Sequence, residues 1–430
     1  MTPLLSQIAR LTKSILLKPT SSEQRPSAKF IAGKHNPFVF PSGIGLTWWY
    51  SEDTFNAIDA VALLLTKESA EFRNCDLESV SELVTKTLQE VCADNTIFDV
   101  DAVFFPRKQT LFECYARSVS QSAESILRAL ETNLRALIGK RCTLYVMPRF
   151  QVSSFLLEND TLHVVAKQDR AAWQRLVDKG YEFDGWTPEN PTLGTRGAPT
   201  FAPPTSFECV LVAEEWGTQK GARFSSILRF RKLTSVLFSV AEQRAEHPYH
   251  KAMARPSQFC IQFPHLSWSD GTTTRSDCEA LIPYFTSDIP IGEAEVAEIQ
   301  RWYEASSTCS QETQQRIEKG AHFLNRALNT TDIESYINYF VTLDALFGER
   351  GAVEASILEG VRTLGIDPKF SEKAPWLFDL RNELVHGGSR YITEWPKYAR
   401  YAQHFRTKPI ADIRSLAQLA VLNAPRVLRQ

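Results

Sequence analysis

The segment 380–388 restricts local structure more than any other stretch of this chain. It reads Leu-Arg-Asn-Glu-Leu-Val-His-Gly-Gly. Gly387 stands where a left-handed helix end is expected, so His386 is predicted to lie in the last turn of a helix over 376–386. The apolar residues recur at helical spacing and predict that this helix is packed; they are Trp376, Leu377, Leu380, Leu384 and Val385.

The same helix carries a cation, an amide and an imidazole. Asn382 and His386 are four residues apart and share one helix face, and the long side chain of Arg381 can reach toward the same place. A fixed cation beside a group that titrates near neutral pH suits chemistry on a phosphodiester. The spacing alone favours an ordinary helix end with a C-terminal histidine and a surface arginine.

Two further helices are predicted upstream. The first covers about 332–347, with Thr331 and Glu334 as a capping box and Gly348 at its end. The second covers about 352–364 and is closed by Gly365.

The order of these pieces resembles the HEPN superfamily, and in particular its Apea-like branch. The matching segments are 343–348, 357–362 and 380–388, within about the last 140 residues. The family signature is Arg, four residues and then His, commonly with a polar residue after the Arg, and Arg381, Asn382 and His386 match it. The acidic residue before the Ala-Leu-Phe run is usually Glu in the family, whereas here it is the shorter Asp344.

The resemblance implies an all-α bundle at 291–430 that pairs about a two-fold axis as a homodimer. Active members of the family are metal-independent endoribonucleases, and many act in phage defence or as toxins. By this resemblance Arg381, Asn382 and His386 are catalytic, Asp344 orients them, and neither a metal nor a cofactor is required. The expected reaction is attack of the RNA 2′-OH, which leaves a 2′,3′-cyclic phosphate and a 5′-OH. The alternative is a non-catalytic module that binds a nucleotide, RNA or a protein partner as a sensor or scaffold.

Charge is unevenly distributed, although the whole chain has a formal net charge of −2. From residue 381 to the end there are nine Lys or Arg against three Asp or Glu, whereas 291–380 is acidic. This basic tail predicts RNA-phosphate contacts by Arg390, Lys397 and Arg400. A solvated helix face explains the same pattern.

The fold class expected is α+β, with a mixed α/β part before the helical bundle. Residues 1–40 are predicted to form a helix and a polar extension, and 41–290 a sensor or regulatory region that responds to a phage-derived or cellular trigger. Within this region 97–104 alternates like a strand, 155–165 reads as a hairpin that turns at 158–160, and 222–242 reads as a long helix. Proline and glycine at 187–206 predict a linker or long loop.

Asp99 and Asp101 on the predicted strand offer a weaker alternative, a metal-dependent nuclease, but the partner segment lacks the Glu-x-Lys spacing that such sites usually show. The eight cysteines contain no C-x2-C pair, and no secretory signal or apolar run of about 18 residues occurs. We therefore expect a cytoplasmic protein with reduced thiols and no membrane span.

Overall fold

The computed structural model gives the structure of most of the chain. The described residues are 2–17, 38–39, 45–46, 49–50, 52–105, 107–181, 183, 208–246, 249–251, 259–267, 273–365 and 369–429. The predicted loop at 187–206 and nearly all of the predicted extension before residue 40 lie outside these ranges.

The chain forms two compact units. The first contains Met1–Arg141 and Glu215–Phe224, and the second contains Cys142–Glu214 and Ser225–Gln430. Each unit encloses its own hydrophobic core. The predicted boundaries near residues 40 and 290 stay predictions.

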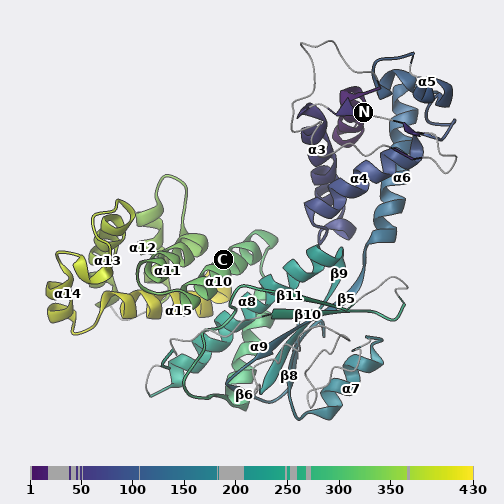
Figure 1. Ribbon diagram of the computed structural model, residues 1–430. Coiled ribbons are helices and arrows are strands. Elements are labelled where there is room, and N and C mark those ends of the chain that lie inside the picture. The colour runs from purple at the N-terminus through teal and green to yellow at the C-terminus, as the bar shows by residue number, and fades with distance from the viewer. Residues whose placement is uncertain are drawn as a thin grey trace. The chain divides into compact units, whose positions relative to one another are not determined.

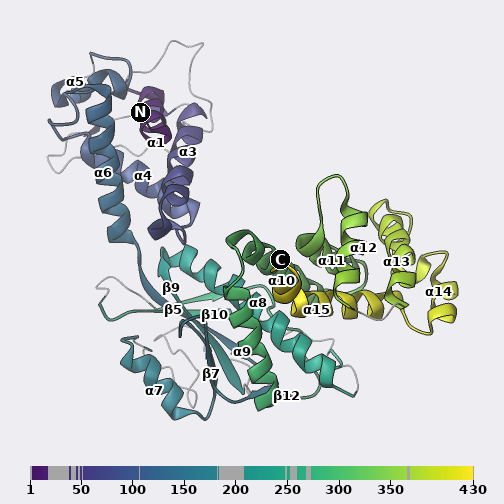
Figure 2. The ribbon, with the colours of Figure 1, turned by 180° about the vertical axis from the view of Figure 1, so that it is seen from behind.

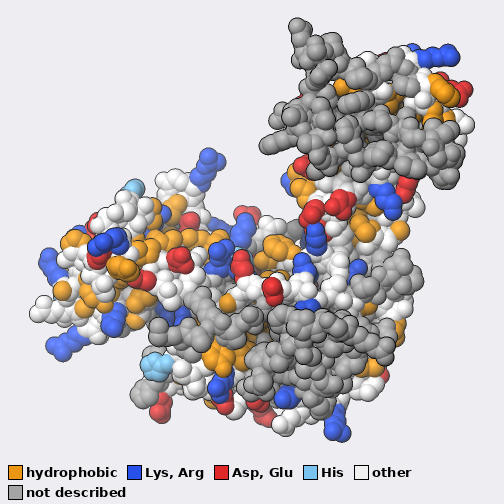
Figure 3. Space-filling view, in the orientation of Figure 1, with side chains coloured by type: hydrophobic (Ala, Val, Ile, Leu, Met, Phe, Trp, Pro, Cys, Tyr) orange, Lys and Arg blue, Asp and Glu red, His pale blue; other side chains and the backbone are white. Residues whose placement is uncertain are grey.

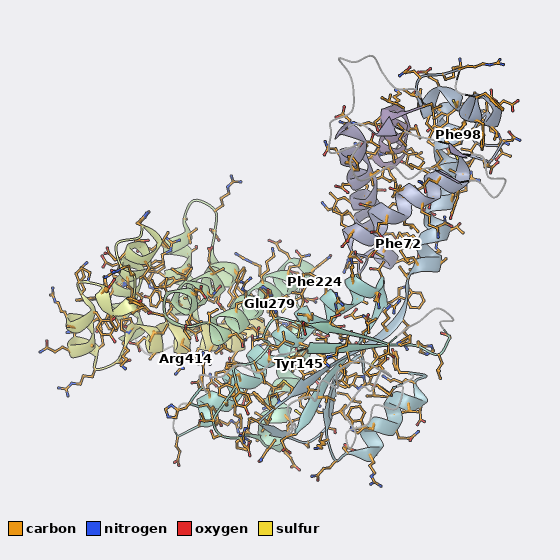
Figure 4. All side chains as sticks on the ribbon, viewed as in Figure 1. Phe72, Phe98, Tyr145, Phe224, Glu279 and Arg414 are labelled. Atoms are coloured by element: carbon orange, nitrogen blue, oxygen red, sulfur yellow. The ribbon has the colours of Figure 1, made fainter. Side chains whose placement is uncertain are left out.

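The first unit is mainly helical. Its core contains Ile8, Val61, Val84 and Leu130, each fully buried on a different helix, and the ring of Phe98, which is labelled in Figure 4. The helices are α1 (Pro3–Ser14), α3 (Glu52–Glu68), α4 (Leu77–Val91), α5 (Val100–Phe104) and α6 (Val119–Leu137). The short strands are β1 (Ile15–Leu16), β2 (Phe38–Val39), β3 (Gly45–Leu46) and β4 (Trp49–Tyr50).

A six-stranded sheet forms the centre of the second unit. The strands lie in the order β11-β10-β5-β9-β8-β7, and β7, β8 and β9 are antiparallel, with Phe155 opposite Val164 and Leu162 opposite Ala213. Their bounds are β5 (Gly139–Met147), β7 (Phe155–Leu157), β8 (Leu162–Ala166), β9 (Cys209–Gly217), β10 (Phe259–Pro264) and β11 (Thr274–Asp277). Two shorter strands, β6 (Phe150–Val152) and β12 (Ile289–Ile291), pair in parallel.

Helices cover both faces of this sheet, as Figures 1 and 2 show from opposite sides. Helix α7 (Arg170–Asp178) places Trp173 and Leu176 against one face. Helix α8 (Gln219–Arg244) places Phe230 and Leu233 against the other. Residues 230–241 of α8 are buried without interruption, so this helix has no solvent-facing side along that stretch.

The C-terminal helices pack on the outer side of α8 and share its core. Ser235 of α8 donates a hydrogen bond to the carbonyl of Ala321 over 2.6 Å, and Asn325 donates to Thr234 over 2.9 Å. The helices are α9 (Glu293–Ser307), α10 (Gln311–Asn329), α11 (Asp332–Phe347), α12 (Val353–Thr363), α13 (Lys369–Val385), α14 (Tyr398–Phe405) and α15 (Pro409–Val427).

The protein is therefore a mixed α/β chain with a C-terminal helical region, as the sequence predicts. The hairpin is confirmed, because Glu158, Asn159 and Asp160 all have positive φ between β7 and β8. The long helix is confirmed as α8. The HEPN-type arrangement of the C-terminal helices stays a prediction.

Two local predictions are wrong. The segment 97–104 is not a strand, because Asp99 accepts a hydrogen bond from the Ala102 N–H and begins α5. The capping box predicted at Thr331 is also wrong, because Thr331 is the N-cap of α11 but its side chain makes no capping hydrogen bond.

Among the described residues, no helix is long and apolar enough to cross a membrane.

A buried carboxylate on the interior strand β9 links the sheet to the segment after α7. Glu214 is bonded to His163 (2.9 Å), Lys179 (2.5 Å) and Tyr181 (2.8 Å), and its side chain is 4% exposed. Burial alone would raise the pKa of Glu214, but hydrogen bonds from His163, Lys179 and Tyr181 outweigh it and lower the pKa from 4.5 to about 2.

We predict that Glu214→Gln lowers the free energy of unfolding by on the order of 3 kcal/mol at pH 7, because Lys179 loses its carboxylate partner and keeps only the Asp160 carbonyl. A depressed folded-state pKa stabilises the fold above the ordinary value of 4.5 and stops doing so as pH falls toward 2. The difference between wild type and variant in urea denaturation should therefore shrink across that range. Glu312→Gln, at an exposed position on α10, is the control. A difference independent of pH would contradict this account.

Candidate functional site

Apolar contacts fix the orientation of α13. Leu377, Leu380 and Leu384 are 1%, 0% and 7% exposed, and the ring of Phe378 lies 5.1 Å from that of Phe340 on α11. The prediction for Val385 is wrong: this side chain is 50% exposed, because it falls on the opposite side of the last turn. The polar residues of α13 therefore lie on a packed helix with one open face.

The helix ends in a Schellman motif. Gly387 has φ +73°, its N–H donates to the Leu384 carbonyl over 3.2 Å, and the Gly388 N–H donates to the Glu383 carbonyl over 2.9 Å. The left-handed end predicted at Gly387 is confirmed. His386 is therefore the residue at which the helix stops.

Two of the three predicted catalytic side chains, Arg381 and Asn382, contact each other, and no hydrogen bond of the described residues joins either one to the His386 imidazole. Arg381 is half-buried, and its Nη1 donates to Asn382 Oδ1 over 3.0 Å. The His386 side chain is exposed, and its backbone N–H donates to the Asn382 carbonyl over 3.0 Å. Within the described ranges, no acidic side chain forms an ion pair with Arg381.

Asp344 lies apart from these contacts. It is an exposed residue near the end of α11, and its carboxylate folds back on its own helix end, where a Cβ added at Gly348 would lie 1.9 Å from Asp344 Oδ1. The hydrogen bonds and ion pairs of the described residues include none between Asp344 and Arg381 or His386. The orienting role of Asp344 stays a prediction.

The three predicted RNA-binding cations are exposed but have partners. Arg390 Nη2 pairs with Glu394 over 2.8 Å, and Lys397 pairs with Asp379 over 2.8 Å. The guanidinium of Arg400 lies over the Trp376 ring, 5.4 Å from its centroid. Figure 3 shows basic side chains scattered among acidic and apolar ones on the C-terminal helices, rather than gathered in one patch.

The sequence interpretation missed these acidic partners. Glu394 is four residues from Arg390, and this spacing was a usable signal. Asp379 has no such signal, because it lies on α13 and reaches Lys397 across a turn of the chain. The hydrogen bond from Lys397, with a second from Trp395, lowers the pKa of Asp379, so this carboxyl group is ionised at neutral pH.

In the part of the chain that the structure describes, no three His, Cys, Asp or Glu side chains are grouped so that they could hold a metal ion. Comparison with protein-family models, curated proteins and solved structures finds no match to this chain. The HEPN resemblance therefore rests on the motif residues themselves.

We predict that Gly387→Ala lowers the free energy of unfolding by about 1 kcal/mol, because a residue with a Cβ is strained at φ +73°. A Cβ at this position meets no atom within 4 Å, so the effect is one of backbone conformation alone. Gly387→Asn should cost less, since Asn tolerates the left-handed region. Urea denaturation of the full chain measures both, and equal losses for the two variants would refute this explanation.

Proposed function

We propose that this protein is a metal-independent endoribonuclease that uses Arg381, Asn382 and His386. One observation carries the proposal: the packed helix that carries Arg381 ends at an exposed histidine, and the only side-chain hydrogen bond of Arg381, within the described residues, is to a neutral amide. No carboxylate of the described residues pairs with that guanidinium and competes with a phosphate for it. The buried apolar face of α13 supports the proposal, because it holds these groups in a fixed arrangement.

The chemistry follows from the needs of RNA cleavage. A base takes the proton of the 2′-OH, the hydroxyl oxygen attacks the adjacent phosphorus, and an acid protonates the departing 5′-oxygen. Arg381 binds the non-bridging oxygens, since a planar guanidinium matches two of them at once. Asn382 orients Arg381 through their hydrogen bond. His386 supplies one of the two proton transfers.

A second copy of the chain supplies the other proton transfer in this proposal. Two exposed apolar residues flank the site and support self-association: Val385 is 50% exposed and Tyr391 is 57% exposed. A two-fold axis near them would place two imidazoles around one phosphate. We further propose that the enzyme acts in phage defence or as a toxin and that the sheet-containing part restrains it until a trigger arrives.

We predict that Arg381→Ala and His386→Ala each reduce RNA cleavage at least about 100-fold, because each removes a group that acts in the transition state. The assay follows end-labelled RNA in the presence of EDTA and identifies the product ends. Wild type should yield 2′,3′-cyclic phosphate and 5′-OH, and a 2′-deoxy substitution at the cut position should block the reaction.

Arg429→Ala and His250→Ala are matched controls, since both positions are exposed and lie off α13. They should leave cleavage unchanged. Cleavage that persists in both α13 variants, or that requires added Mg²⁺, would overturn the assignment.

We also predict that Val385→Asp weakens self-association and cleavage together, because a charge placed in an apolar contact costs desolvation energy. Light scattering coupled to size exclusion should give about twice 48.7 kDa for wild type and the single-chain mass for the variant. Val177→Asp on α7, where Val177 is 47% exposed, is the control. A wild-type protein that cleaves RNA as a single chain would refute the shared site.

A second function deserves a test because two of the predicted RNA contacts are already ion-paired. In this alternative the helix end binds a nucleotide, a short RNA or a partner protein without cutting. Saturable binding of short RNA that depends on Arg381, with no cleavage under any condition, would favour the binding module over the nuclease.

A further inference from the structure

Arg231 on α8 is a buried cation whose hydrogen bonding is incomplete. Its side chain is 6% exposed, and its Nη2 donates to Glu279 Oε2. Its Nε is buried and has no hydrogen-bond partner. Glu279, labelled in Figure 4, is itself 72% exposed. Its carboxylate therefore lies between the buried guanidinium and the solvent.

The two nitrogens matter because Nε and Nη2 lie on the same edge of a guanidinium. A carboxylate or phosphate normally uses both, with one oxygen on each N–H. Here Glu279 uses Nη2 and leaves Nε unpaired, so the preferred two-point contact is half made. A buried donor normally has an acceptor, and an oxygen of a bound anion would supply one here.

Two side chains of α10, His322 and Arg326, lie close enough to Arg231 and Glu279 to interact with them electrostatically. The Nδ1 atom of His322 is also buried without a partner. Burial, with the nearby Arg231 and Arg326, lowers the pKa of His322 to about 4, so the imidazole is neutral at pH 7 and offers one N–H. Arg326 is exposed, and its side chain forms no ion pair with any described acid.

We propose that Arg231, His322 and Arg326 form a binding site for a phosphate group, and that Glu279 is a tethered substitute that the phosphate displaces. Without Glu279 the cluster carries two guanidinium charges, which match a phosphate of about −1.5 to −2 better than a single carboxylate. The ligand oxygens would fill both donors of the Arg231 edge. The site lies on α8 and α10 and does not depend on the function proposed for α13.

The experiment is calorimetric titration of the full chain with inorganic phosphate at pH 7.5 and constant ionic strength. Glu279→Gln removes the competing carboxylate and should tighten binding about ten-fold, as expected for one charged hydrogen bond. Glu312→Gln on α10 makes the same change of charge at an exposed position and should leave the affinity unchanged. Equal affinities in these two variants would overturn the proposal.

Two further variants test the donors. Arg231→Lys keeps the charge but loses the two-point edge, and Arg326→Gln removes an exposed charge that does not contribute to the core. Each should weaken binding about ten-fold, and thermal melting identifies a variant that fails to fold. If Arg231→Lys does not fold, Arg326→Gln decides. Tighter binding of adenosine 5′-monophosphate than of inorganic phosphate would assign the site to a nucleotide, and equal binding to free phosphate.

Discussion

Burial of residues 230–241 of α8 on every side is the constraint on which the second unit depends. Residues 230–241 have no exposed face, yet they include Arg231 and Lys232. A buried cation is stable only with a partner. Lys232 pairs with Glu158 over 2.5 Å, so the β7–β8 turn must lie beside this helix, and Arg231 requires the segment around Glu279 in the same way. The two ion pairs thereby hold the β7–β8 turn and the segment around Glu279 against α8.

Helix α13 shows how a packed element presents polar groups. The leucines of one face sit in the core, so the opposite face is held in place without using its own side chains. The left-handed Gly387 then stops the helix at His386 and directs the chain away, which leaves the imidazole open. A helix one turn longer would have covered that position with further side chains. The glycine is therefore as important to the site as the polar residues.

Much of this arrangement was predictable because it is encoded locally. The periodicity around Leu380, the glycine after His386 and the polar turn at 158–160 are all short-range signals, and each produced a correct element. The strand predicted at 97–104 failed because alternation was given more weight than Asp99, a residue that favours helix starts. The true start of α13 at Lys369 was missed because Pro375 lies inside the helix, where a break is normally expected.

What the sequence could not reveal is which charges cancel. Glu279 is 48 residues from Arg231, and no spacing rule joins them. The net excess of basic residues after 381 likewise hides the ion pair of Lys397 with Asp379. The tail is thus less positive locally than its count suggests, because Arg390, Lys397 and Arg414 each pair with a carboxylate. The local charge of this region therefore depends on which cations have an acidic partner and not only on how many cations there are, and only the folded chain shows the pairing.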